Sequence, residues 1–360
     1  MTAISFNRIL NQDVFKKEDI LSMLKAEGTE QLELFEFASG IKQKYVGNKV
    51  YLRGLVEFSN ICKKDCLYCG IRSSNKNFNR YEVELKDIEE AYDFAIENNF
   101  GSMVIQSGEL QSEQFTEKIY KAIKLIKAKS KGEMRITLSC GEQSEEVYKK
   151  WFKAGAERYL LRIEASNDEL YQKIHPNNKL HCYKSRISAL KKIKEIGFQT
   201  GTGVMIGLPF QTLDDLADDI LFMRDFDIDM CGMGPYIGHE HTPLFDQEEN
   251  LQPLQNRYQL ALKMIAVLRI VMKDVNIAST TALQAINSSG KKSALEIGAN
   301  VIMPNLTPLK YKSEYHLYKD KPGKGLSISS EFNYAIEAIE NANGEVGFGE
   351  PGDALHFTTR

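Results

Sequence analysis

The stretch YLRGLVEFSNICKKDCLYCG, residues 51–70, joins a short apolar run to a group of cysteines. The run at 51–58 predicts a buried β-strand, and Cys62, Cys66 and Cys69 follow it within one loop. The chain has three further cysteines, which lie far apart in the sequence. This usage indicates metal ligands in a reducing compartment and not a disulfide framework.

Short apolar runs and longer amphipathic segments alternate after this stretch. A helix near 213–223 begins with a capping box formed by Thr212 and Asp215, and a helix at 185–196 stops at Gly197. Eight strands that alternate with helices predict a parallel sheet, and the simplest form is a TIM-type (β/α)8 barrel of the α/β class. A doubly wound open sheet is the alternative. The predicted strands lie at 51–58, 102–106, 135–139, 157–163, 200–206, 229–234, 275–280 and 299–303.

The sequence predicts three regions and no flexible linker. Residues 1–45 are polar and helix-prone, which favours an N-terminal helical extension. The barrel is expected over 46–320. Residues 321–360 are rich in glycine and show little periodicity, so we expect a C-terminal tail or a small cap.

Composition excludes several classes of protein. Of the 360 residues 42% are hydrophobic and 26% charged, and basic and acidic residues are interleaved to give a net charge of −3. Such a surface favours neither nucleic acid nor an anionic membrane. No run approaches the roughly 20 apolar residues that span a bilayer, and the N-terminus lacks a cleavable signal. We therefore expect a cytoplasmic protein.

The cysteine group supplies three ligands and leaves a fourth position open. No fourth cysteine lies nearby, and the histidine closest in sequence is His175. Structural zinc sites use four protein ligands, whereas sulfur donors around an open position suit an iron–sulfur centre. A structural zinc site remains the alternative on the residues alone.

The pattern Cys-x3-Cys-x-Tyr-Cys, read here as CKKDCLYC with Tyr68 inside it, resembles the signature of radical S-adenosylmethionine (SAM) enzymes. The resemblance implies that Cys62, Cys66 and Cys69 hold a [4Fe-4S] cluster. It also implies that the unique iron binds SAM, and that the reduced cluster cleaves SAM to a 5′-deoxyadenosyl radical.

The same resemblance implies contacts with SAM at three other places. Ser107, Gly108 and Glu109 are similar to the Gly-Gly-Glu element that meets the SAM amino group, with Ser107 in place of the first glycine. By resemblance, Glu164 would meet the ribose and Arg186 the carboxylate of SAM.

Polar residues also occur at most predicted strand ends, where a barrel carries its active site. Thr137 and Ser139 share one face of their strand, as do Arg162 and Glu164. The alternatives are ordinary polar strand residues and a structural ion pair. Carried over by resemblance, the residues lining the substrate cavity would be Thr137, Ser139, Arg158, Arg162, Met205, Thr280, Thr281, Tyr311 and Tyr315. His239 and His241 fit a solvated loop better than a ligand set.

From about residue 50 to 320 the chain resembles the radical SAM maturases of [FeFe]-hydrogenase, through stretches such as VIQSGE, ERYLLRIEAS and MGPYIGHEHTP. This implies a role in building the diiron subcluster of the H-cluster. The expected partners are companion maturases, a reduced electron donor and a small-molecule substrate, an iron-carbonyl-cyanide cysteine complex. No cysteine follows Cys231, so a second cluster is not expected. The alternatives are a methylornithine synthase, a biotin-synthase-like enzyme and a non-catalytic Fe–S scaffold.

Overall fold

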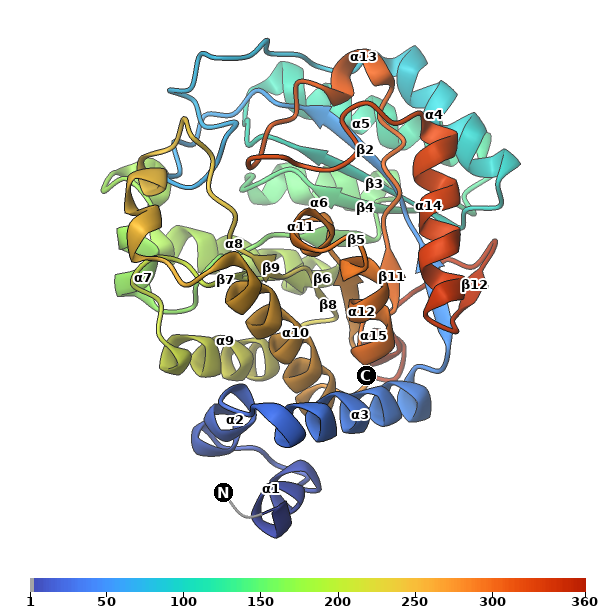
Figure 1. Cartoon of the computed structure of the whole chain (residues 1–360). Helices are drawn as coiled ribbons and strands as arrows, with labels where there is room; N and C mark the ends of the chain where they lie inside the picture. The colour runs from blue at the N-terminus through green and yellow to red at the C-terminus, as the bar shows by residue number, and fades with distance from the viewer. Residues whose placement is uncertain (1–2) are drawn as a thin grey trace.

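The computed structural model describes residues 3–360. The chain begins with three helices, α1 (Ala3–Leu10), α2 (Lys17–Leu24) and α3 (Gly28–Tyr45). They lie together at one end of the molecule, where α2 contacts α9 (Leu213–Phe226) and α3 contacts α10 (Leu254–Val271) (Figure 1).

The main sheet closes into a barrel because one stretch of chain pairs on both sides. That stretch contains β1 (Lys49–Leu52) and β2 (Gly54–Ser59). Starting from β2, the sheet runs through β3 (Ser102–Ser107), β4 (Arg135–Ser139), β5 (Arg158–Leu160), β6 (Gln199–Thr202), β8 (Met230–Cys231), β10 (Asn276–Ser279) and β11 (Val301–Ile302), and it returns to β1. All of these pairs are parallel. The predicted barrel is therefore confirmed, and the open sheet is excluded.

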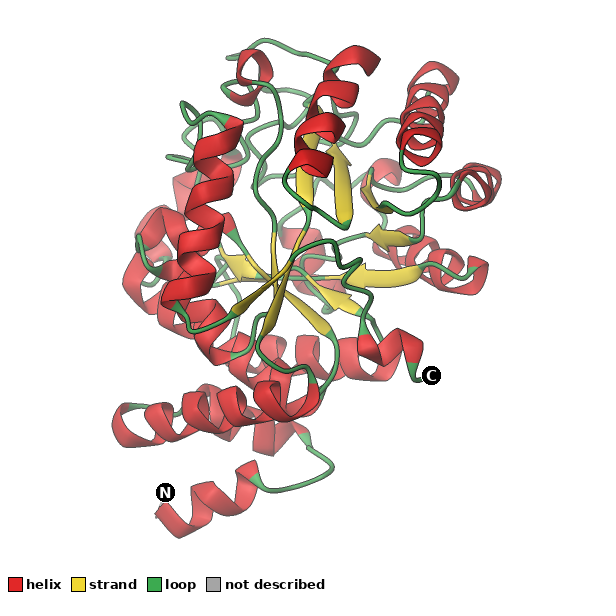
Figure 2. Ribbon diagram, turned by 90° about the vertical axis from the view of Figure 1, so that its right-hand side faces the viewer, coloured by secondary structure: helices red, strands yellow, loops and turns green. Residues whose placement is uncertain are grey.

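Helices surround the strands on the outside of the barrel (Figure 2). Thr212 and Asp215 form the predicted capping box, and Gly197 ends its helix in the left-handed conformation with φ of 106°. The remaining helices are α4 (Leu85–Glu97), α5 (Glu113–Lys129), α6 (Glu145–Ala154), α7 (Asp168–Lys173), η1 (Lys179–His181), α8 (Tyr183–Ile196), η2 (Pro243–Asn250), α11 (Thr281–Ile286), α12 (Gly290–Ile297), α13 (Leu309–Lys312), α14 (Ile328–Asn341) and α15 (Leu355–Thr358).

The hydrophobic core fills the space between strands and helices. Ile105, Leu138 and Trp151 have no exposed surface, and the Trp151 indole N–H donates to the Thr116 carbonyl at 3.1 Å. Such burial is the main source of stability in a domain of this size. Within residues 3–360, no helix is both long and apolar enough to cross a bilayer.

Two features lengthen the barrel at opposite ends. A short parallel pair, β7 (Met205–Ile206) with β9 (Gly234–Pro235), extends the wall beyond the carboxyl ends of β6 and β8. The segment after residue 320 adds β12 (Glu345–Gly347), which pairs in parallel with β1. This segment thus joins the main sheet, and the predicted boundaries at residues 45 and 320 stay a prediction.

Candidate active site

The three cysteines lie in the loop between β2 and α4, at the carboxyl end of the barrel strands. Cys66 is buried, and Cys62 and Cys69 are partly exposed. Burial, followed by the charge of Cys62, raises the pKa of Cys66 to about 12. The pKa of Cys69 is also raised by burial and by the other two thiols. All three thiols belong to one loop segment of eight residues, Cys62 to Cys69.

Three thiolates without a fourth protein ligand fit an iron–sulfur cluster with one open iron. Among residues 3–360, no three or more His, Cys, Asp or Glu side chains close around a position for one metal ion. In a [4Fe-4S] cluster held by three cysteines, each of three irons takes its own thiolate and the fourth iron is left for another ligand. The backbone N–H of Glu109 donates to Cys62 Sγ at 3.3 Å, a contact of the kind that tunes iron–sulfur centres.

The cysteine loop has little regular structure, but polar side chains hold it. Asp65 receives two hydrogen bonds from Arg72, at 2.8 and 2.7 Å, and this guanidinium holds the pKa of the carboxyl far below its usual range. Arg80 donates to four backbone carbonyls, including those of Asn60 and Asn75. The loop is therefore preorganised around its sulfurs.

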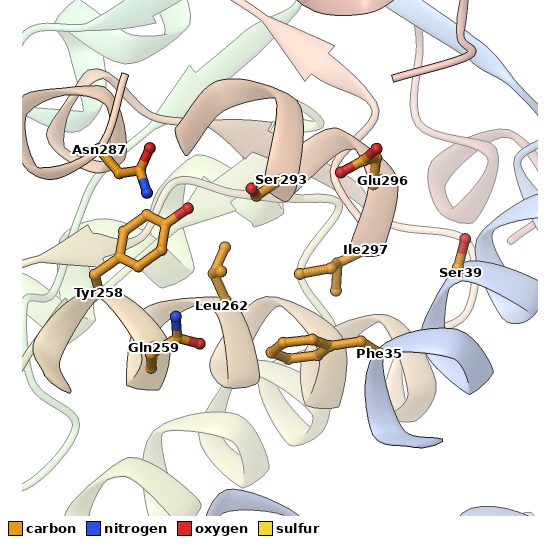
Figure 3. Close-up of a pocket in the computed structure, with 9 residues that line it drawn as sticks. All are labelled: Phe35, Ser39, Tyr258, Gln259, Leu262, Asn287, Ser293, Glu296 and Ile297. Carbon is orange, nitrogen blue, oxygen red and sulfur yellow. The ribbon is translucent and has the colours of Figure 1, made fainter. Parts of the chain in front are cut away.

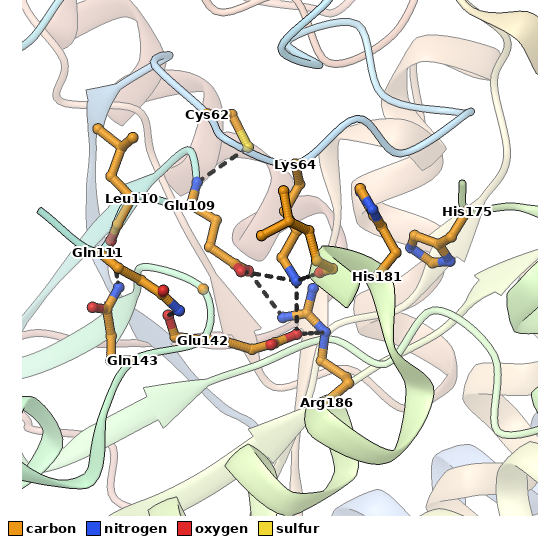
Figure 4. A network of polar contacts seen from close by, with 12 residues as sticks. Cys62, Lys64, Glu109, Leu110, Gln111, Glu142, Gln143, His175, His181 and Arg186 are labelled. Atoms are coloured by element: carbon orange, nitrogen blue, oxygen red, sulfur yellow. Dashed lines mark hydrogen bonds and ion pairs between the residues drawn. The ribbon is translucent and has the colours of Figure 1, made fainter. Parts of the chain in front are cut away.

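Glu109, which follows β3, belongs to a network of four charged side chains (Figure 4). Lys64 Nζ lies 3.1 Å from both Glu109 Oε1 and Glu142 Oε1. Arg186 Nη1 lies 3.2 Å from Glu109 Oε2, and Arg186 Nε lies 3.1 Å from Glu142 Oε1. The structure therefore brings two predicted SAM contacts, Glu109 and Arg186, together next to Cys62.

Sequence reasoning missed Lys64 and Glu142. Lys64 is the third residue of the CKKDC segment, and Glu142 comes directly after the Cys-Gly that follows β4. The position of Lys64 inside the cysteine loop and that of Glu142 at a strand end could both have indicated a site residue. Their pairing joins positions 78 residues apart, which periodicity does not predict.

Gly141 makes room for Glu109. Its φ of +70° favours glycine, and a Cβ added there would lie 2.2 Å from Cγ and 2.4 Å from Oε2 of Glu109. Ser107 closes the same turn locally, because its hydroxyl donates to the Gly108 carbonyl at 2.8 Å. Gly108 itself packs against the Ile61 carbonyl, where a Cβ would lie at 2.3 Å.

Glu164 and Arg162 form an ion pair at 2.9 Å just past β5. Glu164 adopts a φ of 64°, which is strained for a side chain of this kind and is typical of functional sites. Burial raises the pKa of its carboxyl, while the charges of Arg162 and Arg186 oppose that shift. Tyr68 and Met205 pack against one small apolar cluster, and the Tyr68 hydroxyl lies 3.2 Å from His175 Nε2.

Several buried polar atoms of these side chains make no hydrogen bond within the described part of the chain. They are Thr137 Oγ1, Arg162 Nε, Glu164 Oε2 and Arg186 Nε, although the last two take part in ion pairs. Buried polar atoms are nearly always satisfied in native proteins. A polar ligand such as SAM would supply the missing partners, so the residues present fit it.

The remaining cavity residues have local partners. The buried Tyr315 hydroxyl accepts from Gln106 Nε2 at 3.2 Å, and burial, followed by the charge of Glu57, raises its pKa. Thr281 Oγ1 lies 2.9 Å from the Tyr318 hydroxyl, and Thr280 donates to the Met233 carbonyl. Ser139 is partly exposed at the end of β4.

Arg158 departs from its predicted position. It begins β5, at the opposite end from the cysteines, and its side chain has no exposed surface. Its guanidinium contacts Asp353 Oδ1 at 2.6 Å and Ser102 Oγ at 2.8 Å. The structure therefore places Arg158 away from the predicted cavity, because Asp353 and the Pro351 carbonyl of the C-terminal segment bind this side chain.

Tyr311 is a second departure. Its ring stacks on that of Tyr81, with centroids 5.0 Å apart, and its hydroxyl donates to Asp87 Oδ2 at 2.8 Å. Asp87 belongs to the first turn of α4, outside the barrel. The hydroxyl of Tyr311 is thus directed to this helix and not to a cavity residue.

The two loop histidines lie near the cysteine loop. The rings of His239 and His241 are 5.5 Å apart, and a Cβ added to Gly70 would lie 2.5 Å from His239 Cδ2. Burial lowers the pKa of His239. The lowered pKa favours a neutral His239 imidazole, which packs against Gly70 next to Cys69.

A surface pocket of about 460 Å³ lies elsewhere, between α3, α10 and α12 (Figure 3). Its lining comprises Phe35, Ser39, Tyr258, Gln259, Leu262, Asn287, Ser293, Glu296 and Ile297. None of the predicted site residues belongs to it. The cysteine end of the barrel, and not this pocket, carries the chemistry.

Comparisons with known proteins agree with this geometry. Residues 56–223 match the Radical SAM superfamily. The chain is 44% identical over 291 residues to the [FeFe] hydrogenase maturase subunit HydE of Thermotoga maritima, covering 81% of this chain and 79% of that protein.

Two solved structures share the fold. The crystal structure of methylornithine synthase (PylB) has a TM-score of 0.78 at 21% identity and covers 95% of this chain and 97% of its own. The maturase HydG from Carboxydothermus hydrogenoformans has a TM-score of 0.77 at 18% identity and covers 96% and 80%. The chain therefore belongs to the radical SAM superfamily and, within it, to the family of the [FeFe] hydrogenase maturase subunit HydE.

Proposed function

We propose that this chain acts in the maturation of [FeFe]-hydrogenase, at the stage where the diiron subcluster of the H-cluster is assembled. The observation that carries the proposal is the 44% identity to HydE over 81% of the chain. As a member of the superfamily, the chain is a radical SAM enzyme that uses a [4Fe-4S] cluster and SAM.

When bound and reduced, the cluster and SAM supply a 5′-deoxyadenosyl radical. The chain's own residues would bind the cluster and the amino-acid end of SAM. Cys62, Cys66 and Cys69 would hold three irons, Glu109 would accept the SAM ammonium, and Arg186 would bind its carboxylate. These pairings match charge with opposite charge at positions that are buried, where such contacts are strongest.

The wall of the cavity would position SAM and the substrate against each other. Glu164 would accept hydrogen bonds from the ribose hydroxyls, and its pair with Arg162 holds it in the strained conformation. Tyr68 and Met205, which pack on an apolar cluster beside the cysteines, would exclude water from the reacting atoms. Ser107 and Gly108 would shape the turn that presents Glu109.

The substrate residues proposed for the cavity are Thr137, Ser139, Arg162, Met205, Thr280, Thr281 and Tyr315. Thr137 has an unsatisfied buried hydroxyl, and the buried Tyr315 hydroxyl contacts Gln106 of β3. We propose an iron-carbonyl-cyanide cysteine complex as substrate, with attack of the radical on its sulfur. Companion maturases, a reduced electron donor and a cytoplasmic location complete the proposal.

The test is hydrogenase activation in cells that contain the hydrogenase and the companion maturases but no HydE. Hydrogen evolution should appear with this chain and stay absent with Cys66→Ala. If the chain cleaves SAM yet never activates the hydrogenase, the proposed role is wrong. Purified enzyme would then be assayed for methylornithine formation from lysine.

A further inference from the structure

Four charged side chains form a closed ring beside the cysteine loop (Figure 4). Lys64 comes from the loop itself, Glu109 follows β3, Glu142 follows β4 and Arg186 belongs to α8. Their side chains are between 7% and 12% exposed. Two cations and two anions balance, and each carboxylate contacts both cations, so the ring is neutral without any ligand.

Both oxygens of Glu109 are already used in this ring. Oε1 lies 3.1 Å from Lys64 Nζ, and Oε2 lies 3.2 Å from Arg186 Nη1. A ligand ammonium that binds Glu109 must therefore replace at least one of these cations. A buried cation that loses its only carboxylate is strongly destabilised, so ligand binding needs a second acceptor for Lys64 and Arg186.

Glu142 meets that requirement, because its Oε1 lies 3.1 Å from both Lys64 Nζ and Arg186 Nε. Arg186 Nε makes this contact as an ion pair without a hydrogen bond of good geometry, and Nη1, once Glu109 turns away from it, can bind a ligand carboxylate. Lys64 also donates to the Leu180 carbonyl. Both cations thus keep partners that do not depend on Glu109.

The backbone around Glu142 is fixed independently of Glu109's side chain. Gln111 Nε2 donates to the Glu142 carbonyl at 2.9 Å. Gln143 Nε2 donates to the carbonyls of Leu110 and Cys140, at 2.7 and 2.8 Å. These bonds tie the loop after β3 to the loop after β4, so Glu142 stays in place while the Glu109 carboxylate moves.

We propose that Glu142 is a positioning residue for the amino-acid end of SAM. It retains Lys64 and Arg186 when the Glu109 carboxylate turns from them to the SAM ammonium. The inference rests on the proposed roles of Glu109 and Arg186. It adds Glu142, which has no part in those roles. Without Glu142, both cations depend on Glu109 and compete with the ligand for it.

The test is equilibrium binding to the cluster-loaded protein with two ligands. SAM carries the ammonium and carboxylate, whereas 5′-methylthioadenosine has the adenosine and the sulfur but lacks both charges. Glu142→Gln, which keeps the size of the side chain, should weaken SAM binding roughly 10- to 100-fold. The variant should leave its iron content and 5′-methylthioadenosine binding as in the unmodified protein.

Two single variants serve as controls. Glu146→Gln removes an exposed carboxylate outside the ring and should change neither affinity. Glu109→Gln should weaken SAM binding by at least as much as Glu142→Gln. If Glu109→Gln weakens SAM binding and Glu142→Gln does not, the inference is overturned and the role of Glu109 stands. If neither does, the proposed role of Glu109 is wrong as well.

Equal weakening of both ligands by Glu142→Gln would also overturn the inference, because it indicates general damage to the site. If this variant does not fold, the double variant Lys64→Met with Glu142→Gln restores the charge balance and is compared with Lys64→Met alone. With Lys64 absent, Arg186 still needs Glu142, so the double variant should bind SAM more weakly than Lys64→Met. Equal affinities of these two proteins would contradict the proposal.

Discussion

The two ends of the barrel both bury charged side chains, but they balance those charges differently. At the cysteine end, Lys64 and Arg186 share two carboxylates that come from neighbouring loops. At the opposite end of the strands, which we call the floor, two buried arginines, Arg53 and Arg158, face one carboxylate, that of Asp353. Burial lowers the pKa of both arginines. Backbone carbonyls of the C-terminal segment also accept from both arginines, and Ser102 Oγ and Met230 Sδ supply further contacts to Arg158 and Arg53.

The comparison separates charges that serve a ligand from charges that serve the fold. The ring at the cysteine end is neutral without a ligand and lies beside the cluster ligands, since the backbone N–H of Glu109 donates to Cys62 Sγ. The floor charges join β5 to a segment 195 residues further along the chain. In barrels the carboxyl end of the strands carries chemistry, and the other end contributes to stability.

Loss of a cluster ligand should have the largest effect. Cys66→Ala should abolish SAM cleavage, since one iron loses its thiolate, and should leave the barrel folded because the core does not include the cluster. The measurement is 5′-deoxyadenosine formed with dithionite, alongside far-ultraviolet circular dichroism. Cys182→Ala, at an exposed thiol outside the loop, is the matched control. An unfolded Cys66→Ala protein would contradict a purely catalytic cluster.

At the floor, Asp353→Asn should lower the free energy of unfolding by about 3 kcal/mol. The reason is that Arg158, which has no exposed surface, loses its carboxylate. SAM affinity of the folded protein should not change. Asp13→Asn, at a side chain that is 97% exposed, is the control for charge alone. An unchanged denaturant midpoint in Asp353→Asn would show that the floor pair does not stabilise the barrel.

Gly141→Ala should act at the cysteine end through shape and not through charge. The left-handed φ and the close contact with Glu109 should lower the free energy of unfolding by about 2 kcal/mol. SAM binding should weaken as well, because Glu109 must shift. Gly325→Ala, where nothing lies within 4 Å of the added Cβ, provides the comparison. Equal behaviour of the two variants in thermal unfolding and SAM titration would refute the role given to Gly141.

The smallest effect concerns pH at the floor. His356 lies 2.8 Å from Asp274 and 2.6 Å from Asp227, and hydrogen bonding to Asp274, followed by that to Asp227, raises its pKa. Stability from this contact is therefore full below the unfolded pKa of 6.5 and is lost as pH rises through the higher folded pKa. We expect less than about 1 kcal/mol, because the pair is partly exposed.

The measurement is the unfolding temperature of the native protein and of His356→Gln across this pH range. The unfolding temperature of the native protein should exceed that of the variant by less and less as pH increases. A constant difference between the two would mean that the imidazole does not titrate in the folded protein.

The sequence predicted the barrel well because the strand pattern is local. Each predicted strand range overlaps an observed strand, and the capping box at Thr212 formed as expected. The cysteine loop was also predictable, since its ligands lie within eight residues. Neither the ring around Glu142 nor the pair of Arg158 with Asp353 was predicted. Both join segments that are far apart in sequence. The residues around a strand arginine also do not indicate which end of the barrel its side chain faces.

The most direct test measures SAM affinity and the free energy of unfolding on the same two variants, Glu109→Gln and Asp353→Asn. If the two ends differ as described, Glu109→Gln loses SAM affinity with little change in stability, and Asp353→Asn loses stability with unchanged affinity. If both variants lose affinity and stability together, the division between a ligand-binding end and a stabilising floor is wrong.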